Sequence, residues 1–244
     1  MGHSGPGFAF DNESPRHPVW LPAFALANRL VTHGDWLAFM ADGGYAHPRW
    51  WMSAGWDWVR SQRITAPQYW LPANGAESDS GWTTFTLHGR VPIDPHTPMV
   101  HVNWFEADAY ARWQGHRVDL PLRLPTEAEW EHAARHTAPN WADRGNFLES
   151  GALHPLPLAS DTDGLMQMGG DVWEWTGSSY LPHPGYQPWS GAVGEYDGKF
   201  MVNQMVLKGG SCATPRSHIR ASYRNFFPTD ARWQFTGLRL AYSV

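Results

Sequence analysis

The sequence predicts a single α+β domain that is compact, rich in loops and built from a few short helices and short antiparallel strands. Its 244 residues include 16 Trp, 11 Phe and 8 Tyr beside 24 Gly and 20 Pro. Large rings joined by turn-forming residues favour ring packing over long regular elements. Apolar periodicity is also confined to short stretches, which disfavours helical bundles and coiled coils. We therefore expect one domain over residues 1–244.

The first helix is predicted over residues 34–40. Thr32 offers a side-chain oxygen to the first turn, and Gly43 suits the left-handed residue that ends many helices. The following segment, residues 50–80, has no sustained periodicity and contains several turn-forming residues. We expect it to be a long ordered loop that covers the core.

Two further helices and several strands are expected in the rest of the chain. Asn103 can cap a helix over residues 104–114, with Gly115 as its end, and the pair Thr126 and Glu129 matches a capping box. Elsewhere brief strand-like runs alternate with turns. Strands are expected at residues 17–21, 82–87, 172–176, 205–208, 218–223 and 237–242.

Charge and hydropathy exclude several classes of partner. The 18 Lys and Arg residues are outnumbered by 23 Asp and Glu, giving a formal net charge of -5, whereas a nucleic-acid surface needs clustered basic residues. The apolar stretches are far shorter than the roughly 20 residues that span a bilayer. Residues 1–11 are polar and rich in glycine, without the features of a signal peptide. We expect a cytoplasmic protein that binds neither nucleic acid nor membrane.

Cysteine and histidine give little support to a metal site. The single cysteine, Cys212, excludes an internal disulfide and any multi-cysteine site. His132 and His136 lie four residues apart on one predicted helical face, but two ligands do not make a site, and histidine near a helix C-terminus is favoured by the helix dipole. No metal ligands are identifiable in this chain.

The segment 223–235 is the most suggestive of chemistry, because it interleaves aromatic side chains with Arg224, Arg232 and Asp230. Such a mixture suits a ligand with a cationic or heteroaromatic part over ring faces and a carboxylate bound by arginine. The alternative is a core segment whose arginines extend to water. Composition alone leaves the two interpretations about equal.

Longer motifs resemble the formylglycine-generating enzyme (sulfatase-modifying factor) superfamily. They are RLPTEAEWE at 123–131, GDVWEWT at 170–176, GGS at 209–211 and GLRL at 237–240. The resemblance implies that superfamily's loop-rich α+β fold, which is related to C-type lectins. It also implies that Ca²⁺ could bind backbone oxygens near the GDVWEWT turn.

Within this superfamily the chain most resembles the ergothioneine-biosynthesis sulfoxide synthases. The stretches that carry this resemblance are DGGY at 42–45, EADAYARW at 106–113, GAVGEYDGKFM at 191–201 and YRNFFPTDARWQFTGLRL at 223–240. The resemblance implies an oxidoreductase that uses non-haem Fe(II) and O2. Such enzymes join the sulfur of cysteine or γ-glutamylcysteine to hercynine, the trimethylated betaine of histidine, and release a sulfoxide.

The same resemblance assigns roles on the hercynine side of the site. Asn225, Phe226 and Phe227 would hold hercynine, whose trimethylammonium group is a cation–π ligand, and Trp233 would be a further ring facing the ligand. Tyr180 is the candidate for the family's catalytic tyrosine. In the family this residue protonates an iron-bound oxygen species, which prevents oxidation of the thiol sulfur from outcompeting the main reaction.

Charged residues of the same segment are implied to meet the thiol substrate. The resemblance places Arg224, Asp230 and Arg232 near its charged groups.

The sequence also departs from these families. Sulfoxide synthases carry an N-terminal DinB-type domain whose His-x3-His-x-Glu segment supplies iron ligands, and this chain has neither. We therefore expect the C-terminal part of a longer enzyme, or a chain whose iron ligands come from a separate DinB-type partner. Two alternatives are a non-catalytic, lectin-like binding module and a formylglycine-generating oxidase, although the second normally uses a pair of cysteines.

Overall fold

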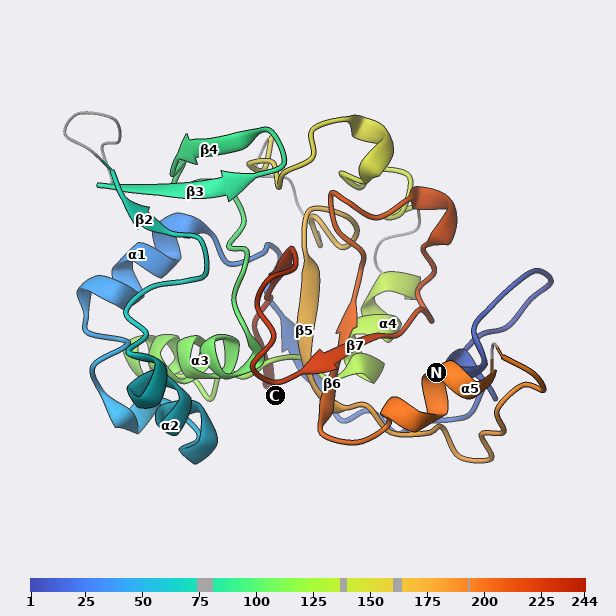
Figure 1. The fold of residues 1–244 in the computed structure, drawn as a ribbon. Helices are drawn as coiled ribbons and strands as arrows, with labels where there is room; N and C mark the ends of the chain where they lie inside the picture. The colour runs from blue at the N-terminus through green and yellow to red at the C-terminus, as the bar shows by residue number, and fades with distance from the viewer. Residues whose placement is uncertain (74–80, 137–139, 160–163, 193) are drawn as a thin grey trace.

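A four-stranded sheet lies at the centre of the computed structural model, with helices on both flanks (Figure 1). The structure describes residues 1–73, 81–136, 140–159, 164–192 and 194–244. The helices are α1 (His33–Ala41), α2 (Ser53–Gln62), α3 (Trp104–Val118), α4 (Glu127–His136) and the single turn α5 (Gly194–Asp197), with a 3-10 turn η1 (Asp11–Glu13) near the N-terminus. The strands are β1 (Phe24–Leu26), β2 (Leu71–Pro72), β3 (Trp82–Thr86), β4 (Gly89–Pro92), β5 (Trp173–Ser179), β6 (Gln204–Lys208), β7 (Asn225–Pro228), β8 (Thr236–Gly237) and β9 (Ala241–Ser243).

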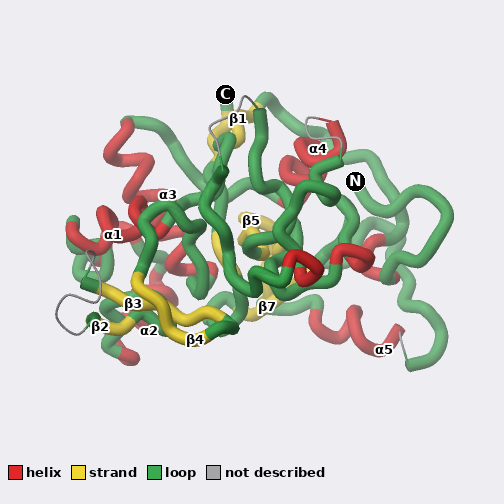
Figure 2. The backbone as a smooth tube through the Cα atoms, turned by 90° about the horizontal axis from the view of Figure 1, so that it is seen from above, coloured by secondary structure: helices red, strands yellow, loops and turns green. Residues whose placement is uncertain are grey.

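The strands form three small sheets. The central one has the order β7-β6-β5-β8, in which β5–β6 and β6–β7 are antiparallel and β5–β8 is parallel. A second sheet has the order β2-β3-β4, and the third pairs β1 with β9. Loops make up most of the remaining chain, as Figure 2 shows. The α+β, loop-rich class expected from the sequence is confirmed.

Reciprocal capping bonds start the three expected helices. The Asp35 N–H donates to Thr32 Oγ1 at 3.3 Å, and the Asn103 side chain accepts from the Glu106 N–H at 2.8 Å. At α4 the Thr126 N–H donates to the Glu129 carboxylate at 2.8 Å. These bonds satisfy donors that a helix N-terminus leaves unpaired, which is why the sequence signal was reliable here.

The expected end of α3 at Gly115 is wrong, because the helix continues to Val118 and ends at the left-handed Asp119 (φ 54°). Gly115 serves close packing instead. A Cβ atom there would lie 2.6 Å from the carbonyl oxygen of Leu120.

The interpretation of residues 50–80 as a loop is also wrong, because α2 and β2 lie within it; residues 74–80 fall outside the described chain. Met52, which precedes α2, makes no side-chain cap, so the start of the helix carries no signal. Its stability comes from tertiary packing: a Cβ atom on Gly55 would lie 2.9 Å from the Phe105 side chain, so only glycine lets α2 come this close to α3.

The strand predictions were partly right. The runs at 82–87, 172–176 and 205–208 coincide with β3, β5 and β6. Residues 17–21 and 218–223 form no strand, and the run at 237–242 is divided between β8 and β9. The His17 side chain and backbone instead bind the nearby carbonyl groups of Pro15 and Met1, which holds this segment in a loop.

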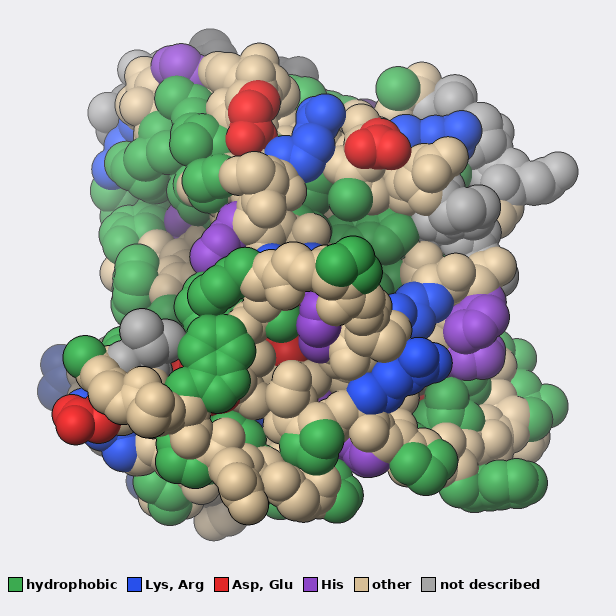
Figure 3. All heavy atoms as spheres, turned by 90° about the vertical axis from the view of Figure 1, so that its right-hand side faces the viewer, with side chains coloured by type: hydrophobic (Ala, Val, Ile, Leu, Met, Phe, Trp, Pro, Cys, Tyr) green, Lys and Arg blue, Asp and Glu red, His purple; other side chains and the backbone are tan. Residues whose placement is uncertain are grey.

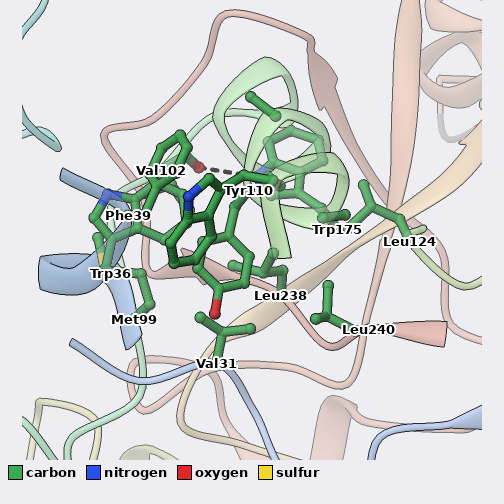
Figure 4. Packing of buried hydrophobic residues seen from close by; sticks show 14 of the residues in the cluster. Val31, Trp36, Phe39, Met99, Val102, Tyr110, Leu124, Trp175, Leu238 and Leu240 are labelled. Carbon is green, nitrogen blue, oxygen red and sulfur yellow. Dashed lines mark hydrogen bonds between the residues drawn. The ribbon is translucent and has the colours of Figure 1, made fainter. Parts of the chain in front are cut away.

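Rings packed between α1 and α3 form what we call the aromatic core: Trp36, Phe39, Tyr45, Tyr110 and Trp113, all buried. Figure 4 labels Trp36, Phe39 and Tyr110 among them. Trp36 and Tyr110 stack with centroids 5.1 Å apart. Beside them, Trp175 of β5 donates its indole N–H to the Val102 carbonyl at 2.9 Å. No helix in the described part of the chain is long and apolar enough to cross a membrane.

Candidate functional site

A cavity of about 300 Å³ opens between β7, α5 and η1. Figure 3 shows the face of the molecule that carries these elements, where hydrophobic side chains surround recesses. The lining of the cavity combines aromatic rings with a few polar groups: Phe10, Asn12, Tyr196, Asp197, Phe200, Gln204, Tyr223, Arg224, Asn225, Phe226, Phe227 and Pro228.

The edge position of β7 explains why its side chains reach the cavity. β7 is the outermost strand of the central sheet and pairs only with β6, where Phe226 opposes Val206 and Phe227 opposes Met205. No further strand covers its outer side among the described residues. The edge is instead bordered by α5, η1 and the loops around them, which leave the cavity.

Phe226 joins several rings into one wall. It stacks on Tyr180 with centroids 4.0 Å apart and planes 9° from parallel. Phe200 and Tyr196 lie 5.9 and 6.2 Å from the Phe226 ring. Offset and tilted rings of this kind present π faces to the space they enclose.

Tyr180 lies behind Phe226, buried, and is not among the residues that line the cavity. Its hydroxyl oxygen accepts a hydrogen bond of 2.9 Å from the amide nitrogen of Asn12. Burial raises the pKa of Tyr180 above its ordinary value. The hydroxyl group therefore stays protonated near neutral pH.

Arg224 lines the cavity, but its donors are already bound within the chain. The guanidinium group makes two hydrogen bonds, of 2.9 and 3.0 Å, to the Glu127 carboxylate. It also donates to the carbonyl oxygens of Asn12 at 3.0 Å and Leu181 at 2.9 Å. Arg224 thus ties α4 and η1 to the start of β7, as a buried bidentate ion pair does.

The remaining predicted residues lie away from this lining. Arg232 donates to the Ala66 carbonyl at 3.2 Å and to Glu106 at 3.3 Å, beside the aromatic core. Asp230 is exposed beyond the end of β7. Trp233 is exposed and contacts Phe227 edge to face at 5.7 Å. The structure therefore brings together Arg224, Asn225, Phe226 and Phe227, with Tyr180 behind them, and leaves the other three outside.

Two acidic residues at the cavity were not singled out from the sequence. Asp197 of α5 lines the cavity, and Asp11 of η1 lies next to it; both are buried. The pKa of Asp197 is raised to about 7, mainly by burial and to a smaller extent by the Asp11 carboxyl group that faces it. Asp11 accepts hydrogen bonds from the Tyr186 hydroxyl at 3.0 Å and the Trp189 N–H at 3.2 Å.

The turn suggested for Ca²⁺ offers no free carboxylate to that ion. The Asp171 carboxylate accepts hydrogen bonds from the Leu156 N–H, the Asn146 amide and the Gln167 amide at 2.7–3.1 Å. Glu174 is paired with Arg239 at 3.0 Å. Both carboxylates are thus bound by protein donors, and Ca²⁺ binding by backbone oxygens of this turn stays a prediction.

The described residues offer no iron site either. They contain no group of three or more His, Cys, Asp and Glu side chains placed to hold a metal. His132 and His136 stack with ring centroids 4.3 Å apart, and the His136 ring bonds the His132 carbonyl. Cys212 is fully buried, and burial raises the pKa of its thiol, so it stays protonated.

Comparison with known proteins places this geometry in context. Residues 1–244 match the family model described as the sulfatase-modifying factor enzyme 1-like domain. The chain is 38% identical over 260 residues to the hercynine oxygenase of Mycolicibacterium thermoresistibile, an alignment that covers 97% of this chain and 54% of that protein. It is 31% identical over 253 residues to the formylglycine-generating enzyme of Streptomyces coelicolor, covering 85% of this chain and 73% of that protein.

A solved structure supports the fold alone. PvdO from Pseudomonas aeruginosa superposes with a TM-score of 0.61 at 18% identity, covering 96% of this chain and 86% of that chain. The chain spans about half the length of the hercynine oxygenases that it matches.

Proposed function

The chain belongs to the sulfatase-modifying factor enzyme 1-like family, and we propose that within this family it is the substrate-binding, C-terminal part of a hercynine oxygenase-type enzyme of ergothioneine biosynthesis. The substrates would be hercynine, cysteine or γ-glutamylcysteine, and O2, and the product a sulfoxide with a new carbon–sulfur bond. The observation that supports it most is a single cavity lined by Asn225, Phe226 and Phe227, in a chain 38% identical to a hercynine oxygenase.

The cavity suits hercynine in size and chemistry. A volume of about 300 Å³ is at the lower end of small-ligand pockets, as a single amino-acid betaine requires. The rings of Phe226, Phe227 and Tyr196 offer π faces to a trimethylammonium group, which is attracted by ring quadrupoles at distances up to about 6 Å. Asn225 adds a polar side chain at the same edge of the cavity.

Iron belongs to this proposal only through residues outside the described chain. Because the described residues hold no ligand set, Fe(II) would be bound by a further domain or by a separate DinB-type partner. What this chain contributes is the shape and polarity of the cavity and the exclusion of water from it.

Tyr180 is proposed as the proton donor of the site. Its pKa is raised by burial, and the Asn12 amide occupies the lone-pair side of its oxygen. The hydroxyl group therefore has a proton to give and a fixed orientation. Phe226 separates its ring from the cavity, so the hydroxyl would act beside Asn12, which does line the cavity.

Calorimetric titration of the chain with hercynine tests the binding part. Phe227→Ala is expected to weaken hercynine binding by about 10- to 100-fold, because one ring face is lost. Phe85→Ala is the matched control, since it removes an exposed ring from β3 that is not part of the cavity lining. Absence of hercynine binding to the wild-type chain would contradict the proposal.

Turnover with and without a partner tests the catalytic part. The chain is incubated with Fe(II), O2, hercynine and cysteine or γ-glutamylcysteine, alone and with a DinB-type protein. Sulfoxide formed only with the partner supports the proposal. Hercynine binding without sulfoxide under either condition favours the second candidate, a non-catalytic binding module. The buried, protonated and solitary Cys212 disfavours a formylglycine-generating oxidase.

A further inference from the structure

The acidic residues around the cavity differ in whether a cation balances them. Glu13 is paired with Arg220, and Glu127 is paired with Arg224. Neither Asp11 nor Asp197 has an ion-pair partner within the described ranges. The cavity therefore carries uncompensated negative potential at one end.

Three oxygens at this end lack a hydrogen-bond donor. Asp11 Oδ1, Asp197 Oδ2 and Asn12 Oδ1 are buried and unpartnered, on side chains that are at most 3% exposed. Asn12 and Asp197 line the cavity itself. The carboxyl groups of Asp11 and Asp197 face each other, so one shared proton satisfies both while either of them is protonated. When both are ionised, the buried oxygens have no donor, which is unfavourable, and a donor or a cation is then missing from this end.

The aromatic rings that line the same cavity determine which cation fits. Phe200, Tyr196 and Phe226 line this cavity, and their ring centroids lie within about 6 Å of one another. A bare metal ion would need several oxygen ligands in a compact shell. Faces of aromatic rings beside a carboxylate instead suit a positively charged alkylammonium group, which is both apolar and cationic.

We propose that the Asp197 carboxylate, supported by Asp11, receives the alkylammonium group of the ligand in this cavity. The proposal rests on the proposed function only for the ligand's identity. Two sources share the chemistry, the trimethylammonium group of hercynine and the ammonium group of the amino-acid thiol. Asp197 contacts the ligand, whereas Asp11 acts through it as a positioning residue.

Proton release should accompany cation binding. Because the pKa of Asp197 is raised to about 7, the free site is partly protonated at pH 6.5, and a cation favours the carboxylate. Affinity should therefore rise with pH between 6 and 8. The titratable groups that face Asp197 are Asp11, Glu13, Tyr180, Tyr186, Tyr223 and Arg224.

The test compares Asp197→Asn with Asp57→Asn, which removes one negative charge from an exposed position on α2. Hercynine, cysteine, choline and the uncharged isostere of choline, 3,3-dimethylbutanol, are titrated into each protein by calorimetry. Asp197→Asn should weaken binding of the ammonium compound by about 10- to 100-fold and leave 3,3-dimethylbutanol unaffected. Asp57→Asn should bind as the wild type does.

Proton release gives a second readout. Titrations at pH 6.5 in two buffers of different ionisation enthalpy should show a fraction of a proton released by the wild type and none by Asp197→Asn. Thermal unfolding at pH 8 checks that Asp197→Asn folds, and its stability should equal or exceed that of the wild type.

The outcomes separate this proposal from the proposed function. Equal affinity for hercynine, for cysteine and for choline, together with equal proton release, in the wild type and Asp197→Asn would overturn the proposal and leave the function standing. Choline binding that depends on Asp197, without hercynine binding, would support the proposal and contradict the function. If Asp197→Asn weakens the binding of cysteine alone, the ammonium group that Asp197 receives is that of the amino-acid thiol. No binding of any ammonium compound to the wild type would overturn the proposal.

Discussion

The aromatic core and the cavity use the same residue types with opposite results. In the core, Trp36 and Tyr110 stack without exposure, and the buried Glu106 is satisfied by the Tyr45 hydroxyl at 2.7 Å, the Asn103 N–H at 2.8 Å and Arg232 at 3.3 Å. At the cavity, Tyr196 is 60% exposed and the Asp197 carboxylate keeps an unpartnered oxygen. An aromatic-rich sequence thus forms both a closed core and an open cavity, and the two differ in whether the buried carboxylate has all of its hydrogen-bond partners.

Truncating one ring in each region should give the largest contrast. Trp36→Ala is expected to lower the free energy of unfolding by about 3 to 5 kcal/mol, because it leaves a cavity in close packing. Tyr196→Ala should change it by less than about 0.5 kcal/mol, since its ring is mostly exposed. Chemical denaturation measures both; comparable losses would show that the two regions do not differ.

Breaking the ion pair behind the cavity should give the next effect. Arg224→Met leaves Glu127 buried without its partner and is expected to cost about 3 kcal/mol in unfolding free energy. The double variant with Glu127→Gln should recover part of this loss, because no charge then remains unpaired. A double variant no more stable than Arg224→Met would indicate that the carbonyl contacts of Arg224 dominate.

The unpaired acid makes the stability of the ligand-free protein depend on pH. Asp197 has a pKa of about 7 in the folded state, against roughly 3.9 when unfolded. Between these two pKa values the folded state binds more protons than the unfolded state. The contribution of Asp197 to the free energy of unfolding is therefore complete below pH 4 and is lost as the pH rises to 7. We expect a loss of about 1 to 2 kcal/mol over this range, reduced by water in the cavity.

Subtracting the unfolding profile of Asp197→Asn from that of the wild type isolates this contribution. A difference that stays flat from pH 4 to 7 would show that the carboxylate is already compensated. The aromatic core, in which Glu106 has its partners, provides no such unpaired acid.

The smallest effect should come from the cap of α1. Thr32→Ala removes the acceptor for the Asp35 N–H and is expected to cost about 1 kcal/mol. Because α1 packs on the aromatic core, hercynine affinity should stay unchanged, which calorimetry can check. Thr32→Ser, which keeps the hydroxyl group, should restore most of the stability.

Local signals explain how much of the fold could be predicted. Thr32, Asn103 and Thr126 each bind a backbone N–H within three residues, so a short stretch of sequence contains the whole interaction. Helix α2 lacks a side-chain cap and depends on Gly55 packing against Phe105 of another helix. No window of local sequence contains that contact, and the prediction of a loop failed there.

The same reasoning applies to the site. Arg224, Asn225, Phe226 and Phe227 are consecutive in the chain, so their mixed character could be recognised together. Asp11 and Asp197 meet only when η1 packs against α5, across most of the sequence. Single acidic residues in separate segments give no indication that they share a cavity.

The contacts of η1 also determine when the cavity can form. Glu13 bonds Arg220 and Ser222, and Asn12 bonds Tyr180, across 207, 209 and 168 residues of sequence. Contacts of such separation close slowly, and the N-terminal residues leave the ribosome long before their partners are made. Assembly of the cavity must therefore wait until nearly the whole chain has been synthesised, and shortened translation products that lack about the last 30 residues would have no place for the ligand.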